Sequence, residues 1–223
     1  MFSGDIVKEP KLAIVLVLDI SGSMHGTIES KKKIDELNEW IMLLKEDLVK
    51  HDLALKRTEI AVITFGRDGI KLAHDFSTPD NFNPPKFQAS GNKKMREAIL
   101  HAIDIVESRK QFYRSNGIDY YRPWILLITD GYSTDMDVID SMWNEVVKAV
   151  HEGDANKKFL FWAVGVEGAD MDRLKRITPT DLVLKLKEAR LKELEWCAMW
   201  HNRIRPSDKQ VQIELPSPQG WGG

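Results

Sequence analysis

Uninterrupted apolar runs are the clearest pattern in this chain, and each stops close to an acid or a glycine. The first run covers residues 12–18 and is followed directly by Asp19. Runs of the same kind lie within residues 59–66, 124–129 and 159–166. Runs of this length that are rich in Val and Ile predict strands buried on both faces, as in a parallel sheet.

Between these runs, apolar residues recur every three or four positions, which predicts amphipathic helices. The expected helices cover about 28–50, 95 to the polar stretch at 114–117, 138–151, 169–177 and 188–204. Two shorter strands are expected at 70–76, as a hairpin with 59–66, and at 182–186. The alternation predicts a doubly wound α/β fold, with a mostly parallel six-strand sheet, one antiparallel edge strand and helices on both faces.

The length of 223 residues fits one well-cored domain, which we expect at residues 1–205. Residues 206–223 are rich in Pro and Gly and are expected to form an extended tail. That tail either packs back on the domain or contacts a partner. The single cysteine, Cys197, excludes a disulfide framework or a cysteine zinc site within one chain.

Charge and hydropathy exclude several function classes. The net charge of −2 argues against a nucleic-acid or anionic-membrane surface, because both require a basic excess. No apolar run approaches the roughly 20 residues that a membrane span needs. The first residues lack the apolar core of a signal peptide, so the expected location is cytoplasmic.

Two groups of residues are interpreted as structural. Tryptophans 40, 143, 162, 196 and 200 lie in helix or strand patterns and are expected in the core. Lysines 31–33 are interpreted as the solvated start of a helix.

Candidate chemistry gathers where two buried strands end. Asp19 is followed by Ser21 and Ser23 at alternate positions, and Asp130 follows the run 124–129. Open α/β sheets place their ligands at the carboxyl ends of the strands. Carboxylate and hydroxyl oxygens suit Mg²⁺, Mn²⁺ or Ca²⁺ rather than zinc. The sequence therefore predicts a divalent-metal site made by Asp19, Ser21, Ser23 and Asp130.

The Asp-x-Ser-x-Ser pattern resembles the metal-ion-dependent adhesion site (MIDAS) of von Willebrand factor A domains. Five blocks in order also resemble the TerY group, small bacterial proteins of this kind that are associated with tellurium resistance. The blocks are residues 19–24, 59–66, 89–91, 129–135 and 163–171, and the tail at 211–221 is similar to the tail of that group.

The resemblance implies a non-enzymatic protein-binding module. It also implies partners, because relatives in the TerY group often accompany a protein serine/threonine kinase and a metal-dependent protein phosphatase. Those assemblies are linked to stress response and to defence against phage.

The second loop departs from the family pattern, in which a Thr hydroxyl ligates the metal. Here Ser90, Gly91 and Asn92 lead to Lys93, whose ammonium cannot ligate a cation. Either Lys93 faces solvent and the other four groups hold Mg²⁺ with added water, or its ammonium lies near Asp19 and Asp130 and neutralises them. Ser90 and Asn92 could supply substitute oxygens. We predict weak or absent Mg²⁺ binding in the isolated chain.

An enzyme is the alternative. The order Asp19-Ile-Ser21 is similar to that of phosphatases that use Asp-x-Asp. In those enzymes the second acid serves as the general acid, and a serine stands in its place here. A phosphatase or another metal-dependent hydrolase acting through Asp19 is therefore the competing hypothesis.

Overall fold

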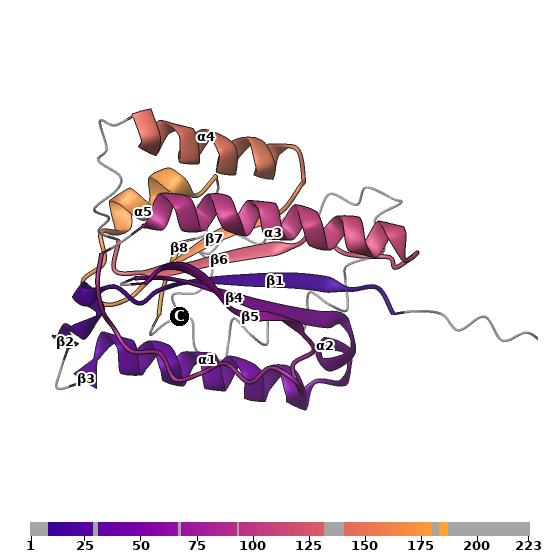
Figure 1. The fold of residues 1–223 in the computed structure, drawn as a ribbon, viewed down its shortest axis with the longest axis horizontal. Coiled ribbons are helices and arrows are strands. Elements are labelled where there is room, and N and C mark those ends of the chain that lie inside the picture. The colour runs from indigo at the N-terminus through magenta and orange to yellow at the C-terminus, as the bar shows by residue number, and fades with distance from the viewer. Residues whose placement is uncertain are drawn as a thin grey trace, which may run out of the picture.

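A six-stranded sheet in the order β5-β4-β1-β6-β7-β8 forms the centre of the molecule (Figure 1). The structure is a computed structural model that describes residues 9–28, 31–66, 68–92, 94–131, 141–179 and 183–186. All neighbouring strands are parallel except β4 and β5, which pair antiparallel at one edge. The strands are β1 (Leu12–Asp19), β4 (Thr58–Gly66), β5 (Gly69–Ser77), β6 (Trp124–Thr129), β7 (Leu160–Gly165) and β8 (Val183–Lys185).

Helices cover both faces of this sheet, which confirms the predicted fold class (Figure 1). On one face lie α1 (Lys33–Lys50) and α2 (Asp52–Arg57), and on the other lie α3 (Met95–Ser115), α4 (Ser141–Ala155) and α5 (Met171–Ile177). No helix in the described part of the chain is long and apolar enough to cross a bilayer.

Strand β1 is buried along its whole length, which explains its unbroken apolar sequence. Leu12, Ile14, Leu16 and Leu18 pack in the core beneath α1, whereas Val15 and Val17 pack in the core beneath α3 and α4. Since successive side chains of a strand point to opposite faces, both sets must be apolar. The expected core tryptophans at 40, 143 and 162 are 5%, 4% and 4% exposed, and those at 196 and 200 lie outside the described residues.

The structure corrects the predicted start of the first helix. Residues 31–32 form a strand, β3, which pairs antiparallel with β2 (Thr27–Ile28). Helix α1 begins only at Lys33, whose backbone amide donates to the Gly26 carbonyl at 3.0 Å. Apolar spacing did not reveal this hairpin, because it is held by backbone hydrogen bonds. The short helix α2 was not predicted either.

Other predicted boundaries shift by a few residues, and some lie outside the described residues. The helix expected at 138–151 is described from Ser141 and continues to Ala155. The terminal helix expected at 188–204, the domain boundary at 205 and the tail lie outside the described residues. Those three features stay predictions.

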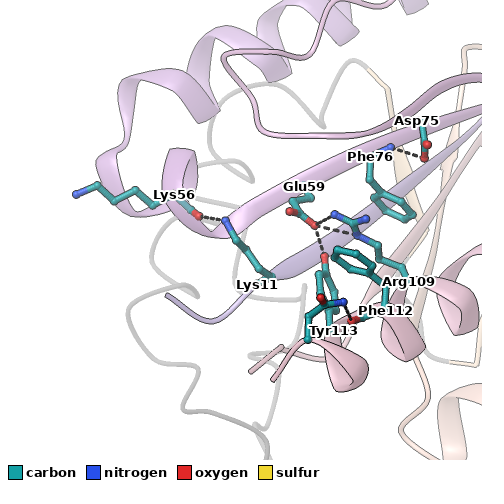
Figure 2. A network of polar contacts seen from close by, with 9 residues as sticks. Lys11, Lys56, Glu59, Asp75, Phe76, Arg109, Phe112 and Tyr113 are labelled. Atoms are coloured by element: carbon teal, nitrogen blue, oxygen red, sulfur yellow. Dashed lines mark hydrogen bonds and ion pairs between the residues drawn. The ribbon is translucent and has the colours of Figure 1, made fainter. Parts of the chain in front are cut away.

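A partly buried polar network ties α3 to the beginning of β4 (Figure 2). It lies at the opposite end of the sheet from Asp19, because Glu59 is level with Ala13 and Asp19 with Phe65 in the pairing of β1 with β4. The Glu59 carboxylate accepts hydrogen bonds from the Tyr113 hydroxyl and from Nε and Nη2 of Arg109 at 3.0 and 2.5 Å. The Arg109 guanidinium also lies 4.9 Å from the Phe76 ring centroid and 4.5 Å from that of Phe112. The network therefore joins α3 to β4 and β5.

Both partners of Glu59 have shifted pKa values. Burial is the largest single influence on the pKa of Arg109 and lowers it, but the hydrogen bonds and negative charges of Glu59 and Tyr113 together outweigh burial and raise the pKa overall. Burial first, and the hydrogen bond and negative charge of Glu59 second, raise the pKa of the Tyr113 phenol. The folded protein therefore favours the neutral form of the Tyr113 phenol.

We expect Tyr113→Phe to lower the free energy of unfolding by about 1–2 kcal/mol, because Glu59 loses a buried donor. Urea unfolding measures this loss. The matched control is Tyr120→Phe, since the Tyr120 hydroxyl only accepts from Arg114 in an exposed hydrogen bond at 3.1 Å, and we expect little change.

The difference should also depend on pH. A raised folded-state pKa stabilises the protein below the ordinary tyrosine pKa of about 10 and loses that stabilisation above it. The gap between wild type and Tyr113→Phe should therefore shrink as pH rises beyond about 10. A gap that stays constant with pH would contradict the proposed role of the neutral phenol.

Candidate functional site

Three loops meet where β1, β4 and β6 end, and they are joined by backbone hydrogen bonds. In the first loop, residues 20–26, the Ile20 amide donates to the Phe65 carbonyl at 3.0 Å. The second loop contacts it twice: the Ser90 amide donates to the Ile20 carbonyl at 2.7 Å, and the Gly22 amide donates to the Gly91 carbonyl at 2.9 Å. The third loop begins at Asp130, directly after β6. Because β1 and β6 are neighbours and parallel, Asp19 and Asp130 lie at the same edge of the sheet.

A glycine makes this close approach of loops possible. A Cβ atom at Gly66 would lie 2.9 Å from the Ile20 carbonyl oxygen and 2.9 Å from the Ser90 carbonyl oxygen. Real Cβ atoms essentially never come so near to backbone oxygens, so a side chain here would push the first and second loops apart. The end of β4 thus sets how closely they pack.

Asp19 is fully buried, and each of its carboxylate oxygens accepts a hydrogen bond. Oδ1 accepts from the Ser21 amide at 2.9 Å, and Oδ2 accepts from the Thr129 hydroxyl at 2.6 Å. The Thr129 oxygen in turn accepts from the Gly131 amide at 3.1 Å. This chain of donors directs the Thr129 proton toward Asp19 and links the first loop to the third.

The two serines of the first loop lie beside Asp19 and differ in exposure. Ser21 is 1% exposed and Ser23 is exposed, and their hydroxyl oxygens are 3.2 Å apart. Ser23 belongs to a short 3-10 helix, Gly22–His25, that turns the chain over the strand end. The pair therefore leads from the buried carboxylate to the surface.

Lys33 lies at the site, which corrects the interpretation of lysines 31–33 as a solvated helix start. Its ammonium nitrogen is 3.6 Å from Asp130 Oδ2, and the two side chains are 16% and 2% exposed. Lys31 instead pairs with Glu39, and Lys32 is exposed. The cation near Asp130 thus comes from the start of α1, a contact that the spacing of the sequence did not reveal.

The third loop turns through a glycine. Gly131 has a φ of +84°, and a Cβ atom there would lie 2.7 Å from the Asp170 amide nitrogen. That amide donates to the Asp130 carbonyl at 3.3 Å. The Asp170 side chain caps α5 by accepting from the Arg173 amide at 3.0 Å. The loop that follows β7 thus supports Asp130 from outside.

The comparison with protein families decides the family. The model of the von Willebrand factor type A domain matches residues 13–195. The chain belongs to that family. Its domains are usually non-catalytic, protein-binding modules, and they often hold a divalent metal at a MIDAS. No match was found among curated proteins.

Solved structures of other proteins share the fold at low identity. The pilus adhesin SpaC from Lactobacillus rhamnosus GG has a TM-score of 0.62 at 14% identity. The match covers 87% of this chain but only 30% of the SpaC chain. The vWF domain of the pili tip protein Mfa5 from Porphyromonas gingivalis has a TM-score of 0.58 at 10% identity, with coverage of 91% and 99%. The manganese-loaded TRAP protein of Plasmodium vivax has a TM-score of 0.50 at 12% identity, with coverage of 80% and 69%.

The oxygens of this von Willebrand A domain fit a hard divalent cation. Mg²⁺ and Ca²⁺ lie about 2.0–2.6 Å from their oxygen ligands. Two oxygens that share such an ion can be about 3 Å apart. The Ser21–Ser23 separation of 3.2 Å meets that condition. The carboxylates of Asp19 and Asp130 would supply the negative charge that balances the ion. Among the described residues there is no group of three or more His, Cys, Asp or Glu side chains that could hold a metal.

The remaining predicted positions are less informative. The backbone of Ser90 holds the first loop, Asn92 is exposed, and Lys93 lies outside the described residues. The predicted effect of Lys93 on the metal stays a prediction.

Two contributors to the site were missed in the sequence: Thr129 and Lys33. Thr129 had a local signal, because it ends a buried strand directly before Asp130. Lys33 had none beyond its membership in a run of three lysines, since its distance to Asp130 depends on how α1 docks on the sheet.

We expect Thr129→Val to lower the free energy of unfolding by about 1–3 kcal/mol, because the change leaves Asp19 Oδ2 without its hydroxyl donor. Thermal or urea unfolding measures the effect. Thr178→Val is the matched control: its hydroxyl donates to the Leu174 carbonyl, which still accepts from the Thr178 amide. Equal losses in both variants would mean that the Thr129 hydroxyl does not support Asp19.

Proposed function

We propose that this domain is a non-enzymatic protein-binding module and that its contact surface is the edge of the sheet around Asp19, Ser21, Ser23 and Asp130. The observation that supports this most directly is the hydrogen-bonded arrangement of Asp19, Ser21 and Thr129 across two neighbouring strand ends. A rigid sheet that presents polar loops is a common basis for binding sites.

A divalent cation at this edge would connect the domain to its partner. Asp19, Ser21, Ser23 and Asp130 would hold the ion, and water would complete its shell. The ion would supply a positive centre for an acidic side chain, so we propose that the partner contributes an Asp or Glu. Binding should then be lost when the metal is chelated. If Lys93 replaces the ion, the partner's carboxylate would pair with that ammonium instead.

A groove beside the site extends the proposed contact surface. It has a volume of about 790 Å³ and is lined by Lys31 of β3, by residues of α1 such as Met42, and by Pro84 and Pro85 of the proline-rich segment 78–88. Asn38 of α1 holds the proline-rich segment against the helix, because its side chain donates to the Phe87 carbonyl at 2.9 Å and accepts from the Phe87 amide at 2.8 Å. Met42 is 47% exposed and offers apolar area to a partner.

The finer assignment rests on the sequence blocks that resemble the TerY group. On that basis we propose a cytoplasmic adaptor that works with a serine/threonine kinase and a metal-dependent phosphatase in stress response, tellurium resistance or phage defence. The comparisons support the family and do not reach this subgroup.

A hydrolase acting through Asp19 is the second candidate, and the surroundings of Asp19 do not favour it. Ser21, where an Asp-x-Asp enzyme carries its general acid, hydrogen bonds to Ser23 instead. Phosphatase or ATPase activity that disappears in Asp19→Ala would reverse this preference.

Calorimetric titration tests the metal site. We expect weak or no Mg²⁺ binding in the wild type and tighter binding in Lys93→Thr, because the substitution adds a hydroxyl ligand and removes a positive charge. Ser23→Ala should weaken binding in the Lys93→Thr background. Its control is Ser108→Ala, whose exposed hydroxyl only donates to the Asp104 carbonyl. Sub-millimolar affinity in the wild type that Lys93→Thr does not improve would contradict the role given to Lys93.

Capture of partners separates the domain surface from the tail. We expect partners that bind the full chain to bind a chain ending at Arg205 as well. If the site holds a metal, the partners should dissociate on Ser23→Ala or on chelation. If Lys93 replaces the ion, they should stay bound in chelator and dissociate on Lys93→Ala or Lys93→Glu. Truncating one member of an interfacial charge pair can cost about 2–5 kcal/mol, so the loss should be measurable. If partners are lost from the shorter chain while its circular dichroism is unchanged, the tail makes the contact, by adding a strand or a proline-rich segment.

A further inference from the structure

The position of Lys33 carries an inference beyond the proposed binding function. Asp130 is almost completely buried, and the Lys33 ammonium lies 3.6 Å from its Oδ2 atom. A buried carboxylate needs a nearby cation or several donors, because removing its charge from water is costly. In this structure Lys33 supplies a positive charge beside Asp130, an acid that the proposed metal site also uses.

The fold holds Lys33 in place from two sides. Its backbone amide donates to the Gly26 carbonyl at 3.0 Å, and its Cε atom lies 3.4 Å from where a Gly26 Cβ would be. Its ammonium nitrogen lies 3.9 Å from the corresponding point at Gly168. The stem of Lys33 thus lies against the first loop, and its head lies beside the loop after β7.

The start of a helix is a poor place for a lysine unless something offsets the cost. The helix dipole disfavours positive charge in the first turn, and Lys33 is the first residue of α1. Asp35 and Glu36 in the same turn act against this cost, and Asp130 adds a buried partner for the Lys33 ammonium. The contact with Asp130 therefore stabilises an inward orientation of the Lys33 side chain over one that extends into solvent.

We propose that Lys33 is an internal counter-ion that competes with a divalent cation for Asp130. The inference rests on the proposed metal site. A cation that uses Asp130 must share it with the ammonium or displace it, so Lys33 weakens metal binding and stabilises the metal-free protein. Because the Lys33 amide is bonded to Gly26, displacement of its side chain would disturb the end of the loop that carries Ser21 and Ser23 and the β2–β3 hairpin.

Titration of the full chain with Mn²⁺ tests this proposal. Lys33→Met keeps the apolar stem and removes the charge, so we expect it to bind Mn²⁺ at least about tenfold more tightly than the wild type. Lys33→Arg keeps the charge and should not tighten binding. Lys32→Met removes the charge of the exposed neighbouring residue and is the matched control, with no change in affinity beyond a weak screened effect.

Thermal unfolding gives a second measurement that does not depend on wild-type affinity. In chelator, Lys33→Met should melt below the wild type and below Lys32→Met, because the buried Asp130 carboxylate loses the charge of the Lys33 ammonium. Mn²⁺ should raise its melting temperature more than that of the wild type, because a tighter ligand stabilises more. If Lys33→Met does not fold in chelator, Lys33→Gln, which keeps a polar head at the site, replaces it.

The outcomes separate this inference from the proposed function. Mn²⁺ binding that Ser23→Ala weakens but Lys33→Met leaves unchanged would overturn the competition and leave the metal site standing. If neither Lys33→Met nor the double variant Lys33→Met, Lys93→Thr binds Mn²⁺, the metal site and the competition both fail. Tighter binding in Lys33→Met with lower stability in chelator would establish Lys33 as the counter-ion.

Discussion

The parallel pairing of β1 between β4 and β6 is the constraint on which the rest of the structure depends. This strand is buried on both faces, so its residues must be apolar until it leaves the sheet. Asp19 is its last residue, and it is fully buried because neighbouring strands and loops surround it. A carboxylate in that position has to be satisfied by nearby groups, and this requirement organises the three loops.

The two acids of the site, Asp19 and Asp130, contact different kinds of group. Asp19 is held by neutral donors, the Ser21 amide and the Thr129 hydroxyl, which fix its orientation. Asp130 is faced by a full positive charge from Lys33. Neutral donors remain compatible with an added cation, whereas an ammonium opposes one. The balance between the metal-free and metal-bound forms would therefore depend more on Asp130 than on Asp19.

The two ends of the sheet carry different kinds of polar cluster. Near the beginning of β4, Glu59 is paired with Arg109 and Tyr113 beneath aromatic rings, and this cluster locks α3 to the sheet (Figure 2). At the carboxyl ends, glycines bring loops together around two acids, and Ser23 reaches the surface. Rigidity at one end allows the loops at the other end to be positioned for binding.

The sequence by itself determined the strands, the alternation with helices and the common edge of Asp19 and Asp130. Those features depend on local periodicity and on the geometry of parallel sheets, which a single chain displays without tertiary information. Only the tertiary structure brought Lys33 to Asp130 and the Thr129 hydroxyl to Asp19. The docking of α1 on the sheet sets the distance from Lys33 to Asp130, and the pairing of β1 with β6 sets the distance from Thr129 to Asp19. Neither distance can be predicted from a run of three lysines or from a threonine at a strand end. Lys93, one candidate cation in the sequence, lies outside the described residues, whereas Lys33 lies beside Asp130 in the structure. Side chains far apart in the chain meet in this way only when the helices are packed.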